Sequence, residues 1–179
     1  MLSDIQFDPI KHEHISLLVS WLNTPHVRLW YSQGQDNPIT YAGVAKKLEP
    51  RITGKEAVYG YIVHIDTIPV GYIQVYDARL FPRDGYNLTD IPEIKTIDRL
   101  AAIDFYIGNP AYIGKGYGTR IVKEFLEQYV KPYYNACLVD PDIRNSASIR
   151  CFEKAGFNKT RELKSDHQHV IIMLLVFNQ

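Results

Sequence analysis

Residues 101–126 read AAIDFYIGNPAYIGKGYGTRIVKEFL, and this stretch decides the fold. Its first seven residues are mostly apolar and predict a buried strand that contains one carboxylate, Asp104. Three glycines (Gly114, Gly116 and Gly118) precede a helix whose apolar residues recur at helical spacing. Glycines let several backbone N–H groups face one anion at the positive end of a helix dipole, so the stretch predicts an anion-binding turn. The same glycines also suit a plain tight turn between a strand and a helix.

The rest of the chain predicts a mixed α/β fold in a single domain that spans residues 1–179. Apolar residues at helical spacing predict helices at 8–23, 41–50 and 144–155. Runs of β-branched, aromatic and other apolar residues predict strands at 58–65, 70–76, 101–107, 136–139, 157–163 and 169–177. The polar segment 77–99 predicts a long loop, and loops of this length in a compact domain are often functional.

Composition and charge argue against several classes of protein. The 20 basic and 20 acidic residues give a net charge of zero, which argues against a nucleic-acid partner. The start of the chain lacks the apolar core of a signal peptide, and the longest apolar run, 170–177, is too short for a membrane helix. We therefore expect a cytoplasmic protein with no membrane partner. The paired histidines His12/His14 and His167/His169 lack an evident third ligand, so we expect no metal.

Two motifs resemble those of a known family. Residues 114–119, GKGYGT, resemble the acetyl-CoA pyrophosphate loop of the GNAT superfamily of N-acetyltransferases. Residues 145–157, NSASIRCFEKAGF, are similar to a later motif of that superfamily, an asparagine followed by a helix and a closing Gly-Phe. Within the superfamily, nearly the whole chain resembles the aminoglycoside 6'-N-acetyltransferases. Residues 21–31 resemble their tryptophan-rich N-terminal motif, and residues 84–86 stand where they carry an acidic, aromatic loop.

The resemblance implies a fold, a co-substrate and a set of contacts. The implied fold is a single GNAT-like domain with a mixed, mostly antiparallel central sheet flanked by helices, and with a V-shaped opening between the fourth and fifth strands. The implied co-substrate is acetyl-CoA, whose carbonyl oxygen is polarised by a backbone N–H near Phe105 and Tyr106. The residues expected to contact acetyl-CoA are Phe105, Tyr106, Ile107, Ile113, Gly114, Lys115, Gly116, Tyr117, Gly118, Thr119, Asn145 and Phe152.

Asp104 is the expected catalytic base, or ammonium anchor, for an amine acceptor. A carboxylate inside an apolar strand is costly to bury unless it is paired or functional, and Asp104 stands where the resembling family has an aspartate at its aminoglycoside site. An outward-facing or salt-bridged strand residue is the alternative. The residues expected to bind the acceptor are Trp30, Tyr31, Asp84, Tyr86, Asp104 and Asp140. The alternatives here are packing of the aromatic rings at 30–31 against the sheet and ordinary turn chemistry at Asp140.

Two positions depart from the pattern of the resembling family. Ile113 stands three residues before Gly116, where Gln or Arg is frequent, which removes at most one contact to the phosphates. Phe152 stands where many relatives carry a tyrosine as general acid for the leaving thiolate, and phenylalanine donates no proton.

The sequence therefore predicts an acetyl-CoA-dependent N-acetyltransferase, a monomer or homodimer that acts on a small-molecule primary amine. The resemblance points to the 6'-amine of an aminoglycoside as the acceptor. Transfer to another small amine, such as a hydroxylysine of siderophore assembly, is one alternative. A non-catalytic acyl-CoA-binding module is the other, and it is motivated by Phe152.

Overall fold

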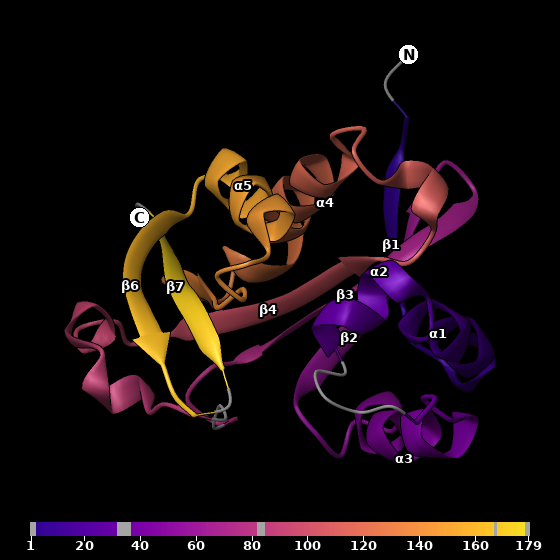
Figure 1. Ribbon diagram of the computed structural model, residues 1–179, viewed down its shortest axis with the longest axis horizontal. Helices are drawn as coiled ribbons and strands as arrows, with labels where there is room; N and C mark the ends of the chain where they lie inside the picture. Colours follow the sequence, from indigo (N-terminus) through magenta and orange to yellow (C-terminus); the bar gives the residue numbers. More distant parts are fainter. Residues whose placement is uncertain (1–2, 32–36, 82–84, 167, 178–179) are drawn as a thin grey trace. The chain divides into compact units, whose positions relative to one another are not determined.

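The computed structural model describes residues 3–31, 37–81, 85–166 and 168–177 (Figure 1). Among these residues, seven strands are hydrogen-bonded in the order β1-β2-β3-β4-β5-β7-β6. The strands are β1 (Ile5–Pro9), β2 (Val58–Ile65), β3 (Ile68–Asp77), β4 (Leu100–Ile107), β5 (Ala136–Val139), β6 (Asn158–Lys164) and β7 (His169–Val176). The helices are α1 (Ile15–Leu22), α2 (Pro25–Tyr31), α3 (Tyr41–Ile52), α4 (Tyr117–Phe125) and α5 (Ser146–Ala155). The predicted mixed α/β fold is confirmed.

The chain divides into two compact units. The first comprises Met1–Gln74 and Phe105–Gly118, and the second comprises Val75–Asp104 and Thr119–Gln179. Strands β3 and β4 therefore each contribute residues to both units. The expectation of one domain over the whole chain stays a prediction. In the part of the chain that the structure describes, no helix is both long enough and apolar enough to cross a membrane.

The first unit contains the antiparallel pair β1 and β2, in register from Ile5 opposite Ile65 to Pro9 opposite Tyr61. Helices α1 and α3 pack on each other, because each has an apolar face at helical spacing. The buried core of this unit contains Ile15, Leu18, Trp21, Val27, Val44, Leu48, Ile62, Tyr72 and Tyr106. Tyr106 belongs to β4, so this core also holds the end of that strand.

Two glycines let this end of β4 approach its neighbours. A Cβ atom on Gly71 of β3 would clash with the carbonyl oxygen of Tyr106 and would lie 3.2 Å from Ile107 Cα. A Cβ atom on Gly108, directly after β4, would clash with the ring of Trp21. The position of the strand end therefore depends on residues that have no side chain at these two points.

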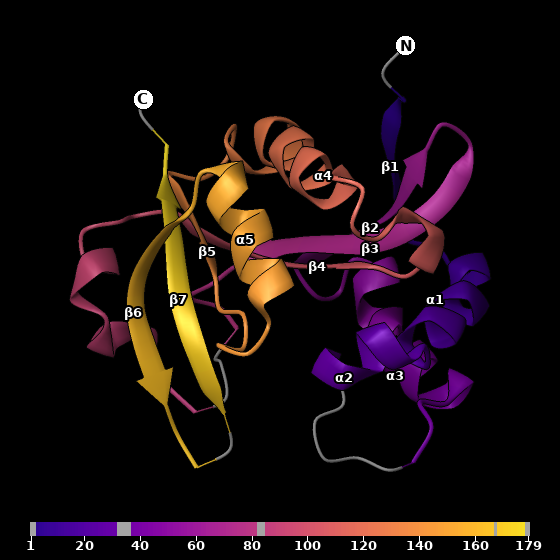
Figure 2. The same cartoon turned by 45° about the horizontal axis from the view of Figure 1, so that its top comes forward.

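The second unit contains a parallel pair of strands. Residues 100–102 of β4 are in parallel register with residues 136–138 of β5. Strands β5 and β6 both pair antiparallel with β7, which lies between them (Figure 2). The buried residues of the two helices are Ile121, Val122 and Phe125 in α4 and Ile149, Phe152 and Ala155 in α5. The V-shaped opening between the fourth and fifth strands stays a prediction.

Near the N-terminus, the structure corrects one prediction and adds one helix. The helix expected from Asp8-Pro9 begins at Ile15, and Asp8-Pro9 ends β1 instead. The helix start expected there was wrong because these residues pair with β2 in the sheet. A proline is tolerated at this position because β1 is an edge strand. The helix α2 was not predicted. It begins at Pro25, which fits because proline is favoured at the first helical position.

The other predicted helices and strands are confirmed with small shifts of their ends. Helix α3 continues past Pro50 to Ile52. In the segment predicted as a long loop, Leu88–Asp90 and Pro92–Ile94 form short 3-10 turns. After α4, Leu126–Val130 continue as one π-helical turn.

Replacing Gly71 by alanine should destabilise the fold. The added methyl group would overlap the Tyr106 carbonyl oxygen, a backbone atom that moves only if the strand moves. We expect the free energy of unfolding to fall by about 1–3 kcal/mol, the usual cost of overpacking. Gly43→Ala is the control, since a Cβ there lies 3.3 Å from Thr40 Oγ1 at the start of α3, and we expect a change below about 1 kcal/mol. Equal free energies of unfolding for the two variants in urea would contradict the close approach of Gly71 to the Tyr106 carbonyl oxygen.

Candidate active site

The glycine loop is exposed and lies directly before α4. Gly114 and Gly116 have φ angles of 75° and 83°, in the left-handed region that favours glycine. A Cβ atom at either position would meet nothing within 4 Å among the residues described. Helix α4 begins at Tyr117, and the first N–H groups of a helix have no intrahelical partner. A diphosphate suits this loop, because an open backbone and a helix N-terminus both favour an anion, and the exposed Lys115 adds a positive charge.

The end of β4 is held in an aromatic cluster. The centroid of the Tyr106 ring lies 6.5 Å from that of Trp21, 5.1 Å from that of Tyr31 and 5.8 Å from that of Tyr72. Burial, with Tyr72 close by, raises the pKa of Tyr106 well above its usual range, so the phenol stays neutral. His26 Nε2 lies 3.0 Å from the carbonyl oxygen of Ile107. The Tyr106 side chain is thus part of the core, and its predicted contact with acetyl-CoA would come from its backbone.

The aromatic residues at the end of α2 have different environments. Tyr31 is 42% exposed, although its ring packs edge-on against Tyr106. Packing, the alternative to acceptor binding, accounts for this edge contact, and the remaining surface of the ring is exposed. Trp30 is half-buried. The predicted role of both rings in acceptor binding stays a prediction.

Two of the predicted acceptor-binding carboxylates come shortly after the paired residues of β4 and β5. Ala102 of β4 is in register with Leu138 of β5, and Asp104 and Asp140 each follow two residues later. Asp104 lies in β4, whereas Asp140 directly follows the last residue of β5, so the register places the two residues on neighbouring chain segments without setting the direction of the Asp140 side chain. Both are half-buried, and both have interaction partners. The parallel register therefore brings together two carboxylates that are far apart in the sequence.

Tyr86 joins this pair through Asp140. Its hydroxyl donates a hydrogen bond of 2.7 Å to Asp140 Oδ2. The preceding residue, Gly85, has a φ of 85°, and a Cβ there would lie 2.6 Å from Gln168 Nε2 and 2.7 Å from Ser165 Oγ. Ser165 and Gln168 belong to the connection between β6 and β7. No sequence pattern indicates these two residues, because the contact joins segments that are distant along the chain.

Asp84, also predicted to bind the acceptor, lies outside the residues that the structure describes. Its role stays a prediction.

Two residues predicted to contact acetyl-CoA have structural roles in α5. Asn145 is the N-cap of this helix, and its side-chain oxygen accepts a hydrogen bond of 3.1 Å from the Ser148 N–H. Phe152 is 5% exposed, and its ring centroid lies 5.4 Å from that of Phe157. Asn145 thus caps α5 and Phe152 packs in the core, and the contact of either residue with acetyl-CoA stays a prediction.

The structure gives no support for a nucleophilic cysteine at Cys151. Burial raises the pKa of its thiol, and its sulfur lies 3.9 Å from Thr119 Oγ1. A raised pKa lowers the thiolate population, which is the reactive form. Among residues 3–31, 37–81, 85–166 and 168–177, no group of three or more His, Cys, Asp or Glu side chains has an arrangement that could hold a metal ion.

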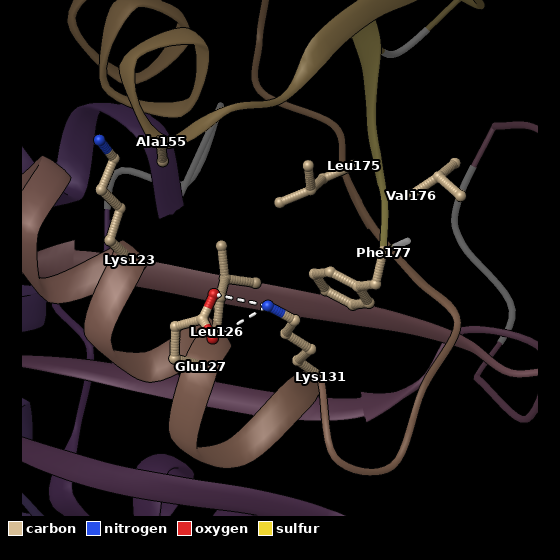
Figure 3. Close-up of a pocket in the computed structure, with 8 residues that line it drawn as sticks. All are labelled: Lys123, Leu126, Glu127, Lys131, Ala155, Leu175, Val176 and Phe177. Atoms are coloured by element: carbon tan, nitrogen blue, oxygen red, sulfur yellow. Dashed lines mark hydrogen bonds and ion pairs between the residues drawn. The ribbon is translucent and has the colours of Figure 1, made fainter. Parts of the chain in front are cut away.

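A hollow of about 440 Å³ lies in the second unit, apart from the predicted site residues (Figure 3). It is lined by Lys123, Leu126, Glu127, Lys131, Ala155, Leu175, Val176 and Phe177. Figure 3 shows the ion pair between Glu127 and Lys131, whose Oε2 and Nζ atoms lie 3.1 Å apart. None of the predicted site residues is among these eight, so this hollow is not the predicted site.

Comparison with known proteins defines the family. Residues 11–165 match the acetyltransferase (GNAT) domain family, and the chain therefore belongs to the GNAT acetyltransferases. It is 35% identical over 151 residues to the aminoglycoside N(6')-acetyltransferase type 1 of Klebsiella pneumoniae, a match that covers 82% of this chain and 71% of that relative.

Solved structures of the aminoglycoside acetyltransferase AAC(6')-Ib have the same fold. The complex with coenzyme A and kanamycin has a TM-score of 0.79 and 26% identity, and the match covers 97% of this chain and 95% of that one. The complex with paromomycin and acetyl-CoA has a TM-score of 0.80 and 26% identity, with 97% and 93% covered. The predicted GNAT membership and the likeness to aminoglycoside N-acetyltransferases are confirmed.

The capping role of Asn145 predicts different effects of two substitutions. Asn145→Ala removes the acceptor for the Ser148 N–H and should lower the free energy of unfolding by about 1 kcal/mol. Asn145→Asp keeps an acceptor oxygen and should remain within about 0.5 kcal/mol of the wild type. Chemical denaturation of the three proteins measures the difference. A similar loss in both variants would argue against the cap.

Proposed function

We propose that this protein transfers the acetyl group of acetyl-CoA to the 6'-amine of an aminoglycoside. Membership of the GNAT family supports acetyl-CoA as the donor. Two similar structures hold coenzyme A with kanamycin, or acetyl-CoA with paromomycin, which supports an aminoglycoside acceptor. The observation that carries the proposal is the register of β4 and β5, in which Ala102 and Leu138 are paired two residues before Asp104 and Asp140. Aminoglycosides are polycations, and two carboxylates on neighbouring chain segments suit two ammonium groups of one molecule.

Direct attack of the amine on the thioester accounts for the reaction. The nitrogen lone pair adds to the carbonyl carbon, the C–S bond breaks, the amine nitrogen loses a proton, and the thiolate of coenzyme A takes one up. Asp104 serves as the base for the amine proton or as the anchor of its ammonium form, and Asp140 binds a second ammonium group. A backbone N–H near Phe105 and Tyr106 polarises the carbonyl oxygen. Holding both substrates together converts a bimolecular attack into an effectively unimolecular one.

The leaving thiolate obtains its proton from water in this proposal. Phe152 has no proton to donate, and its ring is buried against Phe157. A free thiol has a pKa of about 8.5, so a released thiolate is protonated by water near neutral pH without a protein donor. The absence of a tyrosine at this position is therefore compatible with an active enzyme.

The cytoplasmic location and the assembly state, monomer or homodimer, stay predictions, as does the expectation that the reaction uses no metal. The proposed partner is a small-molecule amine.

A negative charge in the glycine loop should weaken acetyl-CoA binding. Gly116→Asp adds a carboxylate where we expect the diphosphate, at a position with open space for a Cβ. We expect at least tenfold weaker binding in isothermal titration calorimetry, or about 1.4 kcal/mol. Gly54→Asp is the matched control, since Gly54 has a φ of 74° and a Cβ there also meets nothing within 4 Å, so both variants carry similar backbone strain. Unchanged affinity of folded Gly116→Asp would exclude the loop as the diphosphate site.

Removing the charge of Asp104 should slow acetyl transfer. Asp104→Asn keeps the shape of the side chain and removes both the base and the anchor for an ammonium group. We expect kcat/KM for the best acceptor to fall at least tenfold, equivalent to about 1.4 kcal/mol of transition-state stabilisation. Asp98→Asn, at an exposed position before β4, controls for the change in net charge. Wild-type kinetics in Asp104→Asn would remove this residue from the mechanism.

A panel of acceptors tests the function as a whole. Release of coenzyme A is measured with kanamycin, tobramycin, hydroxylysine and simple monoamines, and it is corrected for hydrolysis without an acceptor. Faster release with the aminoglycosides supports the proposal. Faster release with hydroxylysine would reassign the acceptor to siderophore assembly. Binding of acetyl-CoA without transfer to any amine would identify a binding module and overturn the proposal.

A further inference from the structure

The described part of the segment between β3 and β4 contacts the rest of the second unit through Gly85, Tyr86 and Glu93, among other residues. The Tyr86 hydroxyl donates to Asp140 Oδ2 at 2.7 Å. Gly85 fits closely against the Ser165 and Gln168 side chains in the connection between β6 and β7. Further along the segment, Arg161 Nη2 of β6 lies 3.2 Å from Glu93 Oε1. The Tyr86 hydroxyl therefore lies beside the end of β5, and the residue before it is closely packed.

Asp140 is held by its own side chain and by the backbone of the residue that follows it. It directly follows β5, and the carbonyl oxygen of the next residue, Pro141, accepts a hydrogen bond of 3.0 Å from the Ile171 N–H of β7. The bond from Tyr86 then restricts rotation of the carboxylate, because a hydrogen bond to an ionised acceptor is short and directional. A carboxylate offers about four lone-pair positions, so it accepts from a tyrosine and from an ammonium group together.

We propose that Tyr86 is a positioning residue that orients Asp140 toward a second ammonium group of the acceptor, and that this arrangement selects diamines and polyamines over monoamines. The inference rests on the proposed function and names the class of acceptor. Asp104 takes the reacting amine, and Asp140 takes the second one. Ala102 and Leu138, the last paired residues of β4 and β5, each stand two residues before one of these carboxylates, so we expect two amines of one molecule to reach both.

Kinetics with matched acceptors test this role. Tyr86→Phe removes only the hydroxyl and keeps the ring. We expect KM for kanamycin and for 1,3-diaminopropane to rise about tenfold, with kcat changed less than twofold, because the second ammonium contributes to binding rather than to bond making. With propylamine, which has one amine, both constants should stay at the wild-type values. Tyr133→Phe is the control, since Tyr133 is 64% exposed in the same unit and should leave all three acceptors unaffected.

A double-mutant cycle shows whether Tyr86 acts through Asp140. If it does, Tyr86→Phe combined with Asp140→Asn should raise KM for the diamine no further than Asp140→Asn alone. Gly85→Ala disturbs the packing of the same segment against Ser165 and Gln168. It should also raise KM for the diamine and leave the kinetic constants for propylamine unchanged. Circular dichroism confirms that each variant is folded before its kinetics are compared.

The outcomes separate the two proposals. Equal losses with propylamine and with the diamine would make Tyr86 a merely structural residue, and additive effects in the cycle would uncouple it from Asp140. Either result overturns the inference and leaves the proposed acetyl transfer intact. Failure of the wild-type protein to acetylate any amine overturns the proposed function itself, and the inference with it.

Discussion

The parallel register between β4 and β5 is the constraint on which the acceptor side of the site depends. Residues 100–102 and 136–138, which form the register, are fully buried. Two hydrogen bonds also hold the residues directly before the paired ones. The Asn135 N–H donates to the Arg99 carbonyl oxygen at 2.8 Å, and the Arg99 N–H donates to Asn135 Oδ1 at 3.2 Å. A shift of one residue would move every side chain of a strand to the opposite face. The placement of Asp104 and Asp140 on neighbouring chain segments is therefore a consequence of burial several residues away.

Features with a strong local signal were predicted correctly from the sequence. The strand, glycine loop and helix of residues 101–126 each have a clear pattern in their own sequence, and so do the hairpin strands β2 and β3. Strand β1 was missed because Asp8-Pro9 carries a helix-capping signal, whereas its strand conformation comes from pairing with residues more than fifty positions away. Helix α2 was missed because Pro25 was taken only as a residue that prevents the preceding helix from continuing. Proline is also favoured at the first position of a helix, and Pro25 begins α2.

The sequence proposes the candidate site as a set of residues, and it does not predict how those residues are arranged. Asp104 was identified because a carboxylate in an apolar strand is unusual, and this signal is local. The sequence does not indicate that Tyr86 donates a hydrogen bond to Asp140. It also does not indicate that Gly85 packs closely against Ser165 and Gln168, because these segments are distant along the chain and share no pattern. At Asn145, the residue type that the motif requires is also the type that caps a helix, so the sequence did not separate the two roles.

Tryptophan fluorescence reports on only one of the two units of this protein. The chain has two tryptophans, and both Trp21 of α1 and Trp30 of α2 belong to the first unit. Trp21 is 6% exposed, so its indole emission changes when the core around Tyr106 opens to water. Far-ultraviolet circular dichroism instead records the helices and strands of both units. A single midpoint from the two signals means that the units melt cooperatively, whereas an earlier indole transition means that the N-terminal helices come apart first.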